Sequence, residues 1–309
     1  MLSRVAENIY WMARYIERAE NTARLINVNT HLLLDFPKRV RLGWEPIIDI
    51  ASNRDYFYSL YEEADERSVL RFMVTDTRNP GSILSSLSMA RENARTIRDI
   101  IPREAWERVN DLYLVAKADA QSGLARRGRF FYLRTVILGA QTITGLLAGT
   151  MTHDEGYDFL RMGRNLERAD MTTRIIDVRS ASLLAEQREG LTYENIQWMS
   201  VLKSLTAYQM YRRTRTWIAR RPDVLKFLLQ NPSFPRALYH GLCEMEACLK
   251  NLPHHDKPLA AVRGLEGQLL EADPAHLKQA ELHAFIDDLQ IHLAAIHDTI
   301  AATYFLIKR

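Results

Sequence analysis

The segment MARYIERAENTARLINVNTHLLL occupies residues 12–34, and a second segment, MGRNLERADMTTRIIDVRSASLL, occupies residues 162–184. At an offset of 150, identical residues in the two segments include Met12, Arg14, Glu17, Arg18, Ala19, Thr22, Arg24, Val28, Leu33 and Leu34. Chance at ordinary composition would give roughly one or two identities over such a length. Apolar residues recur every three or four positions in both segments, which is the period of an amphipathic helix. Two copies of one long helix therefore decide the fold.

Weaker matches extend the repeat along the chain. The stretch Val69-Leu-Arg-Phe72 matches Val224-Leu-Lys-Phe227 at an offset of 155, and Thr142-Ile143 matches Thr299-Ile300 at an offset of 157. Because the offset rises in chain order, the pattern indicates one complete duplication with small insertions in the second copy. The predicted halves are residues 1–152 and 153–309. Two similar units in one chain are expected to pack about a pseudo-two-fold axis.

The remaining sequence is helical in its pattern, because strand-like alternation and Asn-Gly or Asp-Gly hairpin signals are missing. Expected helix starts are Asn79 before Pro80, Thr152 with Glu155 three residues later, and Asp273 before Pro274. The fold class predicted is all-α, a tandemly duplicated long-helix bundle. The helices are expected at about residues 2–34, 44–61, 65–75, 80–100, 103–121, 128–149, 153–188, 192–220, 222–230, 233–251, 258–271 and 275–307.

A charged residue falls inside the apolar stripe of each repeated helix. On a helical wheel, Glu20 lies among Ile9, Ala13, Ile16 and Ala23, and Asp170 takes the same place in the second copy. An unpaired carboxylate in an apolar interior is too costly to persist. We therefore expect both acids to be largely buried and each to bond an arginine, either Arg24 or Arg174 one turn later or an arginine from another helix.

A third cluster of charges lies between the two copies. Arg91, Arg95 and Arg98 share one helical face, with Glu92 beside them, and they are candidate partners for the buried acids. The matching stretch of the second copy, residues 244–248, is acidic instead. The two halves are therefore no longer chemically equivalent.

Two interpretations of these charges remain open at this stage. They form a buried salt-bridge network that fixes the packing of long helices, or they line a cleft in which arginines grip a carboxylate or phosphate. Either way they are the candidate polar cluster, with no catalytic role assigned to any of them. Its members are Arg14, Glu17, Arg18, Glu20, Asn21, Arg24, Arg91, Glu92, Arg95, Arg164, Glu167, Arg168, Asp170 and Arg174.

Composition excludes several other classes of protein. The formal net charge is +3 and no long run of one charge sign occurs, so nothing in the balance demands a nucleic acid. The two cysteines, Cys243 and Cys248, are too few for a disulfide framework and favour a reducing cytoplasm. Charged residues interrupt the N-terminal segment, and the most apolar stretch, Leu133–Gly149, is short and carries Arg134. We therefore expect neither export nor membrane insertion.

The motifs of metal and nucleotide chemistry are missing from the sequence. None of the nine histidines has a glutamate three positions before it, so the ligand pattern of di-iron bundles is absent. His283 with Asp287 and Asp288 with His292 are interpreted as surface pairs at one-turn spacing. Phosphate-binding glycine loops and the Gly-x-Ser-x-Gly elbow are also absent. We expect no metal and no cofactor.

The charged motifs resemble those of the bacterial alpha-E family, an all-helical domain named for its recurring Glu-Arg motif. The motifs that carry the resemblance are Arg14-Tyr-Ile-Glu17-Arg18-Ala-Glu20-Asn21-Thr-Ala-Arg24, its copy Arg164-Asn-Leu-Glu167-Arg168-Ala-Asp170-Met-Thr-Thr-Arg174, and Arg91-Glu92-Asn-Ala-Arg95. The resemblance runs over essentially the whole chain and carries over no catalytic residue. It implies companions, namely circularly permuted ATP-grasp proteins and transglutaminase-like proteases.

Three functions are compatible with these features. The first is a non-catalytic helical partner, which docks onto an ATP-grasp peptide or amide ligase or presents its substrate. The second is an enzyme of peptide or amide-bond chemistry that uses Glu17, Glu20, Glu167 or Asp170 as acid and base. The third and weakest is a nucleic-acid binder, suggested by arginines and aromatics interleaved in residues 208–221. The first is the function expected here.

Overall fold

The computed structural model of the protein describes residues 1–35, 43–51, 53–186, 194–214 and 218–306. Within these residues the regular structure is helical and no strand occurs, so the predicted all-α fold class is confirmed. The chain forms two compact units, Met1–Arg164 and Asn165–Arg309. Their boundary falls inside a long helix, twelve residues after the expected boundary between the repeats at 152 and 153. The duplication and its two-fold axis stay predictions.

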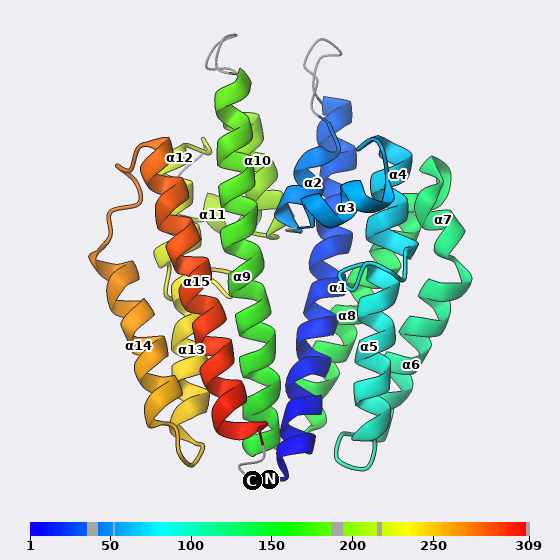
Figure 1. Cartoon of the computed structure of the whole chain (residues 1–309), viewed down its shortest axis with the longest axis vertical. Coiled ribbons are helices and arrows are strands. Elements are labelled where there is room, and N and C mark those ends of the chain that lie inside the picture. The colour runs from blue at the N-terminus through cyan, green and yellow to red at the C-terminus, as the bar shows by residue number, and fades with distance from the viewer. Residues whose placement is uncertain (36–42, 52, 187–193, 215–217, 307–309) are drawn as a thin grey trace. The chain divides into compact units, whose positions relative to one another are not determined.

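The first unit is built around two long helices, α1 (Ser3–Asp35) and α8 (Arg126–Thr150). Shorter elements lie between them in the chain: α2 (Glu45–Ile50), α3 (Arg54–Leu60), α4 (Glu66–Leu70), the π-helical turn η1 (Arg71–Thr75), α5 (Ile83–Thr96), α6 (Arg103–Ala118) and α7 (Ala120–Leu124). Helix α1 packs against α5 and α8, and α6 packs against both of those helices (Figure 1).

The apolar stripe predicted for α1 forms the core of this unit. Its buried members are Ile9, Ala13, Ile16, Ala19, Ala23 and Ile26. Leu2 is an exception, because α1 begins at Ser3 and leaves the Leu2 side chain 76% exposed. Burial of one isoleucine side chain stabilises a fold by about 1.5 to 3 kcal/mol, so this stripe is a large part of what holds α1 in place.

The second unit takes most of α9 (Glu155–Glu186) and the helices that follow it. These are α10 (Glu194–Ser204), α11 (Tyr208–Arg212), α12 (Arg221–Gln230), α13 (Leu238–Lys250), α14 (Asp256–Glu271) and α15 (Gln279–Tyr304). Helix α14 packs between α13 and α15, and α12 packs against α13 and α14. Helices α1 and α9 are 33 and 32 residues long, and α8 and α15 are 25 and 26 residues long.

Helix α8 is, among the described residues, the one helix long and apolar enough to cross a membrane by length and composition. One of its faces belongs to the interior of the first unit, where Leu133, Val136 and Ala140 are fully buried. A Cβ atom added to Gly139 would lie 2.5 Å from Leu112 Cδ1 of α6, so the two helices are in close contact there. Only 33% of the most apolar stretch of α8 is buried, so the opposite face of the helix lies on the surface of the unit.

The expected start of α5 is wrong by three residues. Ser82, and not Asn79, is the N-cap, and its hydroxyl accepts a hydrogen bond from the Ser85 N–H at 3.1 Å. The Asn79 side chain instead donates to the Phe72 carbonyl and accepts from the Gly81 N–H. Asn79 therefore stabilises the turn before the helix. An asparagine side chain can cap a helix or stabilise a turn through the same hydrogen bonds, so the residue type alone does not distinguish the two roles.

The other two expected helix starts are also displaced. Helix α9 begins at Glu155, where the Asp154 carboxylate accepts from the Gly156 N–H at 2.9 Å, so Asp154 replaces Thr152. Helix α15 begins at Gln279, five residues after Pro274. Asp273 contacts His276 instead, with 2.7 Å between the carboxylate and Nδ1.

Two expected helices are interrupted. The helix expected at 44–61 is divided into α2 and α3, and the helix expected at 192–220 into α10 and α11. Thr206 has a φ of 55°, a left-handed conformation that is unfavourable for a β-branched residue and ends α10. Residues 215–217 of the second interval lie outside the described residues.

The turn η1 widens the helix that α4 begins. The Asp76 N–H donates to the Arg71 carbonyl at 2.9 Å, which closes a loop one residue longer than an α-helical turn. The Asp76 carboxylate then accepts from the Tyr61 hydroxyl at 2.7 Å and from Arg78, at 2.9 Å from Nε and 2.6 Å from Nη2. Asp76 thus fixes the end of η1 to the loop that follows it.

Acid should weaken this connection. Hydrogen bonds from Arg78 lower the pKa of Asp76 from 3.8 to about 2, so its bonds contribute stability that is complete above about pH 4 and is lost as the pH falls toward 2. We expect Asp76→Asn to lower the free energy of unfolding by on the order of 1 to 2 kcal/mol at pH 7, since the half-exposed Arg78 limits the gain. Urea unfolding from pH 7 to 2.5 should show the two proteins converging in acid. A difference that stays constant with pH would contradict the assignment.

Candidate functional site

The Glu-Arg motif of α1 places a buried ion pair in the first unit. The Glu20 carboxylate accepts from Arg24 at 2.8 Å, and the two side chains are 4% and 12% exposed. Gln141 of α8 lies 3.5 Å from the same carboxylate oxygen. The expected burial of Glu20 and its bond to an arginine are therefore confirmed. The pair is largely shielded from solvent, which favours a role in packing over a grip on a substrate.

The other arginines of this motif lie over aromatic rings. Arg14 Cζ is 4.7 Å from the centroid of the Trp11 ring, and Arg18 Cζ is 5.4 Å from that of Tyr15. The Trp11 and Tyr15 rings are stacked with their centroids 5.3 Å apart. Cation–π contacts of this kind help to hold guanidinium groups in place. The one-turn spacing of the two aromatic residues is a signal for this arrangement that the sequence analysis did not use.

Two further polar residues of α1 are in the interior. Glu17 is 2% exposed and Asn21 is 3% exposed. Both are engaged in interactions within the protein, as are Arg14 and Arg18. A glutamate so far from water needs compensating partners, because an isolated buried carboxylate is strongly unfavourable. These residues therefore belong to a connected polar network rather than to a solvated surface.

The copy of the motif in α9 is less deeply buried. Asp170 accepts from Arg174 Nε at 2.8 Å, so its expected bond to an arginine is confirmed. The two side chains are 22% and 25% exposed, so Asp170 is less buried than Glu20. Glu167 is 3% exposed, and Arg164 is half-buried and also engaged within the protein.

Arg168 connects α9 to the loop before α13. Its Nη1 donates to the Pro235 carbonyl at 3.4 Å. One turn later the Thr172 hydroxyl lies 3.0 Å from the Arg236 carbonyl. Two residues of the second motif thus hold a loop of their own unit in place, which is a structural role.

The arginines of α5 do not join the acids of α1, so this expectation is corrected. Arg91 donates to Asn110 of α6 at 2.7 Å and to Glu92 at 2.9 Å, and Arg95 donates to the same glutamate at 2.9 Å. Arg98 is 62% exposed. The face that these arginines share points toward α6 and solvent, because α5 uses Leu87, Ala90 and Ala94 as its buried face. Arg91, Glu92 and Arg95 form a separate surface network.

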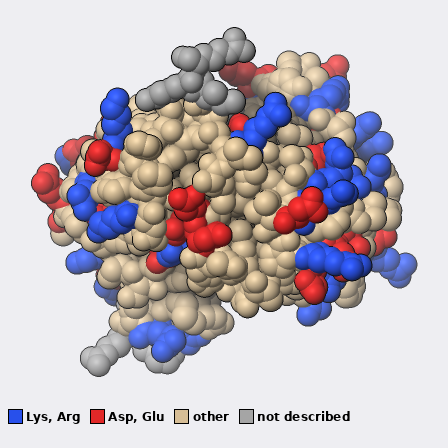
Figure 2. All heavy atoms as spheres, turned by 90° about the horizontal axis from the view of Figure 1, so that it is seen from below, with Lys and Arg blue, Asp and Glu red and all other residues tan. Residues whose placement is uncertain are grey.

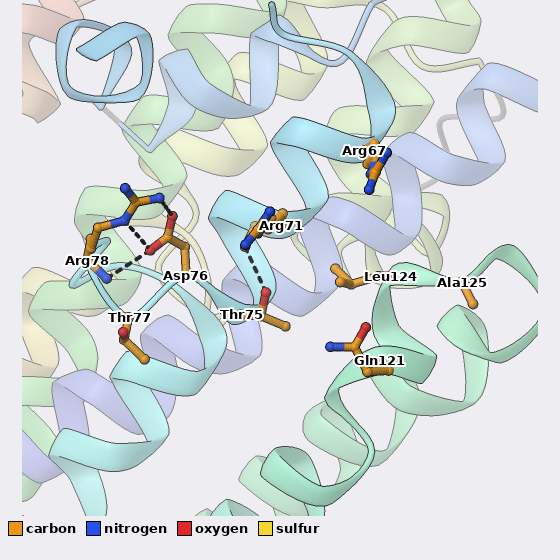
Figure 3. A pocket seen from close by; sticks show the side chains of 9 residues that line it. All are labelled: Arg67, Arg71, Thr75, Asp76, Thr77, Arg78, Gln121, Leu124 and Ala125. Atoms are coloured by element: carbon orange, nitrogen blue, oxygen red, sulfur yellow. Dashed lines mark hydrogen bonds and ion pairs between the residues drawn. The ribbon is translucent and has the colours of Figure 1, made fainter. Parts of the chain in front are cut away.

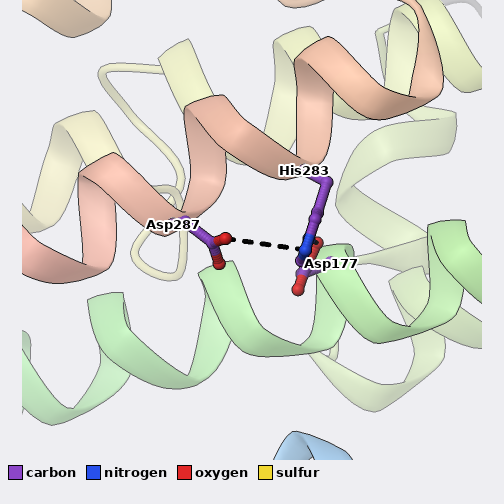
Figure 4. A group of neighbouring side chains, drawn as sticks. All are labelled: Asp177, His283 and Asp287. Atoms are coloured by element: carbon purple, nitrogen blue, oxygen red, sulfur yellow. Dashed lines mark hydrogen bonds and ion pairs between the residues drawn. The ribbon is translucent and has the colours of Figure 1, made fainter.

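A histidine and two aspartates meet in the second unit. His283 Nδ1 is 2.7 Å from Asp177 of α9, and Nε2 is 3.5 Å from Asp287 (Figure 4). The hydrogen bond to Asp177 raises the pKa of His283, and burial raises the pKa of Asp177 itself. The surface pair expected from the sequence therefore has a third member. One ligand atom from each residue lies within 4.8 Å of the others, so this is the group of described residues most suited to hold a divalent metal ion.

Charges elsewhere are mixed in sign. Figure 2 shows lysine and arginine side chains intermingled with acidic ones on the face that it draws. In the stretch that suggested a nucleic-acid binder, Arg212 Cζ lies 5.8 Å from the centroid of Tyr208, whereas Arg215 and Trp217 lie outside the described residues. The face in Figure 2 therefore has no continuous basic surface.

Helix α8 exposes a largely apolar face to solvent, on which Arg134 is an exposed charged residue. No charged residue occurs from Thr135 to Thr150. Phe131 and Leu138 on this face are 67% and 46% exposed, and a Cβ atom added to Gly145 or Gly149 would meet no atom within 4 Å. We call this the α8 outer face; its exposed members are Phe131, Arg134, Thr135, Leu138, Thr142, Gly145 and Gly149.

A small hollow adjoins the α8 outer face. Its volume is about 200 Å³, and Val115 of α6 lines it together with Phe131 and Thr135. Val115 is itself 43% exposed. Exposed apolar side chains beside a hollow are typical of surfaces that contact another protein.

Residues 1–305 of the chain match one known family, described as a predicted alpha-helical domain with a conserved ER motif. The chain belongs to the Alpha-E family. Among its relatives are uncharacterized proteins of Mycobacterium bovis and of two Mycobacterium tuberculosis strains, CDC 1551 and H37Rv, each 24% identical over 318 residues. No solved structure matches the chain.

The Alpha-E chain differs from these relatives in length. The match covers 96% of this chain but only 35% of each mycobacterial protein. The chain therefore spans about a third of the length of the relatives that it matches. In those proteins an Alpha-E-like segment is one part of a longer polypeptide.

Proposed function

We propose that the protein is a non-catalytic helical partner of an ATP-grasp peptide or amide ligase, which it docks onto or to which it presents a substrate. The observation that carries the proposal is the length of the mycobacterial relatives, in which the matching segment is 35% of the chain. A segment that is one part of a longer polypeptide commonly acts together with the other parts of that polypeptide. The resemblance to a family with ATP-grasp companions indicates an ATP-grasp protein as the partner.

The α8 outer face is the docking surface in this proposal. An apolar surface of the partner buries Phe131 and Leu138. Because Gly145 and Gly149 have no side chain and no neighbouring atoms, a helix of the partner can approach the α8 backbone closely there. Small residues on one helix face allow such an approach because no side chain separates the two backbones. No charged residue occurs from residue 135 to 150, so Arg134 at one end is the charged member of the face, and the rest of it can be buried without removing a charged group from water.

The Glu-Arg network has a structural role in this proposal. The pair Glu20 and Arg24 is on the face of α1 that contacts α8, where Gln141 meets it. A rigid network beneath α8 would hold the docking face in one shape. Rigid elements present an interface at a lower entropic cost than flexible ones.

Removal of an apolar anchor from the α8 outer face should abolish docking. We expect Leu138→Asp to weaken binding to a permuted ATP-grasp protein of the same cell by at least about tenfold, because it places a charge in an apolar contact. Isothermal titration calorimetry with the two purified proteins measures this. The matched control is Ile291→Asp on α15, another long helix, where the isoleucine is 66% exposed and the affinity should be unchanged.

Other outcomes contradict the proposal in distinct ways. Equal loss of affinity in both variants would place the contact away from α8. Binding of the chain to lipid vesicles instead of the ATP-grasp protein would make the α8 outer face a membrane contact. Peptide ligation or ATP hydrolysis by the isolated chain would favour an enzyme, and failure to bind any permuted ATP-grasp protein of the cell would refute the partnership.

A further inference from the structure

A large polar pocket opens in the first unit beside η1. Its volume is about 1010 Å³, and α4, η1, the loop after η1 and α7 surround it. Figure 3 shows Arg67 and Arg71 on one side of the pocket and Gln121 of α7 on the other. Arg78 and Thr77 of the loop complete its polar lining. The lining is therefore rich in hydrogen-bond donors.

The pocket carries an excess of positive charge. Arg78 is bonded to Asp76 through two nitrogen atoms, so these two charges balance each other. Arg67 and Arg71 are exposed and contact no carboxylate among the described residues. Glu66, which is adjacent to Arg67 in the sequence, forms ion pairs with Arg126 at 2.6 Å and with Arg129 at 2.8 Å. Two guanidinium groups that form no ion pair within 4 Å with any described residue thus face one hollow, and the charge of Arg67 also helps to lower the pKa of the neighbouring Asp65.

The π-helical turn η1 determines the position of Arg71. Arg71 begins η1, and its carbonyl accepts from the Asp76 N–H and from the Thr75 hydroxyl at 3.2 Å. Arg67 precedes it by four residues, so both side chains lie on one side of the continuous helix. A π-helical turn is rare, and such turns are frequently found at functional sites. At the offset of 155, the second copy has Pro222, Lys226 and Ser233 in place of the three arginines, within or after a regular α-helix.

We propose that this pocket binds a small molecule through its phosphate or carboxylate group. Arg67 and Arg71 are the charged contacts, because guanidinium forks match the paired oxygens of both groups. Gln121 and Thr77 are placed to bond the remaining acceptors of the ligand. The pocket and the α8 outer face are separate sites, and the proposal does not depend on docking to an ATP-grasp protein.

Calorimetric titration of the whole chain at constant ionic strength tests the site. The probes are inorganic phosphate and pyrophosphate for one ligand class, and citrate and the dipeptide Glu-Glu for the other. We expect at least one probe to bind, and Arg67→Gln with Arg71→Gln to weaken it by about tenfold or more, since each lost charge-assisted bond is a strong one. Arg71→Lys should recover only part of the affinity, because lysine keeps the charge but loses the fork.

The matched control is Arg108→Gln on α6, which removes an exposed arginine outside the pocket and should leave binding unchanged. Because the exchanged side chains are exposed, all variants should unfold at the wild-type temperature, which a thermal scan checks. Equal weakening in the control and the double variant would reduce the effect to overall charge and overturn the proposal. Failure of all four probes to bind at millimolar concentration would also overturn it.

Discussion

Glu20→Ala should lower the free energy of unfolding by about 3 to 5 kcal/mol, because it leaves Arg24 charged and shielded from water without its partner. The two side chains are 4% and 12% exposed, so solvent cannot replace the lost bond. Against a total stability of about 5 to 15 kcal/mol, such a loss is severe. It should lower the unfolding midpoint by on the order of 10 °C.

A matched variant separates burial from the mere loss of an ion pair. Glu92→Ala removes the acid that bonds Arg91 and Arg95 on α5, where the glutamate side chain is 43% exposed, and it should cost less than about 1 kcal/mol. The double variant Glu20→Met with Arg24→Met should recover most of the stability, because no charge is then stranded. If Glu20→Ala were as mild as Glu92→Ala, the pair would have to be solvated.

The part of this site that the sequence predicted follows from helical periodicity. The stripe of α1 placed Glu20 in the core and Arg24 one turn later, and the structure has the pair in contact. The same reasoning was less accurate for Asp170, because a wheel gives the direction of a side chain and not its length. All-α architecture was equally accessible, since apolar residues at helical spacing need no knowledge of the neighbouring helices.

Contacts between helices were beyond the sequence. Arg91 was expected to meet the acids of α1, but it bonds Asn110 of α6, because the packing of α5 turns its arginines away from α1. Asp177 is 106 residues from His283, and nothing in either segment predicts their hydrogen bond. Periodicity defines which face of a helix is buried; it does not define which helix covers that face.

Local irregularities were missed for a different reason. Asn79 and Ser82 are both good capping residues, and the choice between them depends on the fold of the loop around Phe72. The turn η1 has no signature in sequence, because a π-helical turn adds one residue to a helix without a change in composition. The pocket beside η1 therefore could not be predicted from the sequence, although the sequence contains its arginines.

The second large effect on the free energy of unfolding is expected where α1 contacts the start of α9. Gly163 lies so close to α1 that a Cβ atom at this position would be 2.3 Å from the Tyr10 carbonyl oxygen and 3.0 Å from the Tyr10 carbonyl carbon. Tyr10 is fully buried, so its backbone cannot yield without moving α1. In the alignment of the two motifs, Gly163 takes the place of Ala13, so this position tolerates a methyl group on one helix but not on the other.

Gly163→Ala should therefore lower the free energy of unfolding by about 1 to 3 kcal/mol through overpacking, although alanine is the better helix former. The control is Gly264→Ala on α14, where an added Cβ would meet nothing within 4 Å. There the exchange should raise stability by about 0.5 to 1 kcal/mol, since it removes only the flexibility of glycine. Urea unfolding of both variants at pH 7 measures the two changes. Opposite signs are expected because helix propensity is the same at both sites and only the contact with Tyr10 differs. A gain of stability in Gly163→Ala would mean that α1 and α9 do not approach each other this closely in solution.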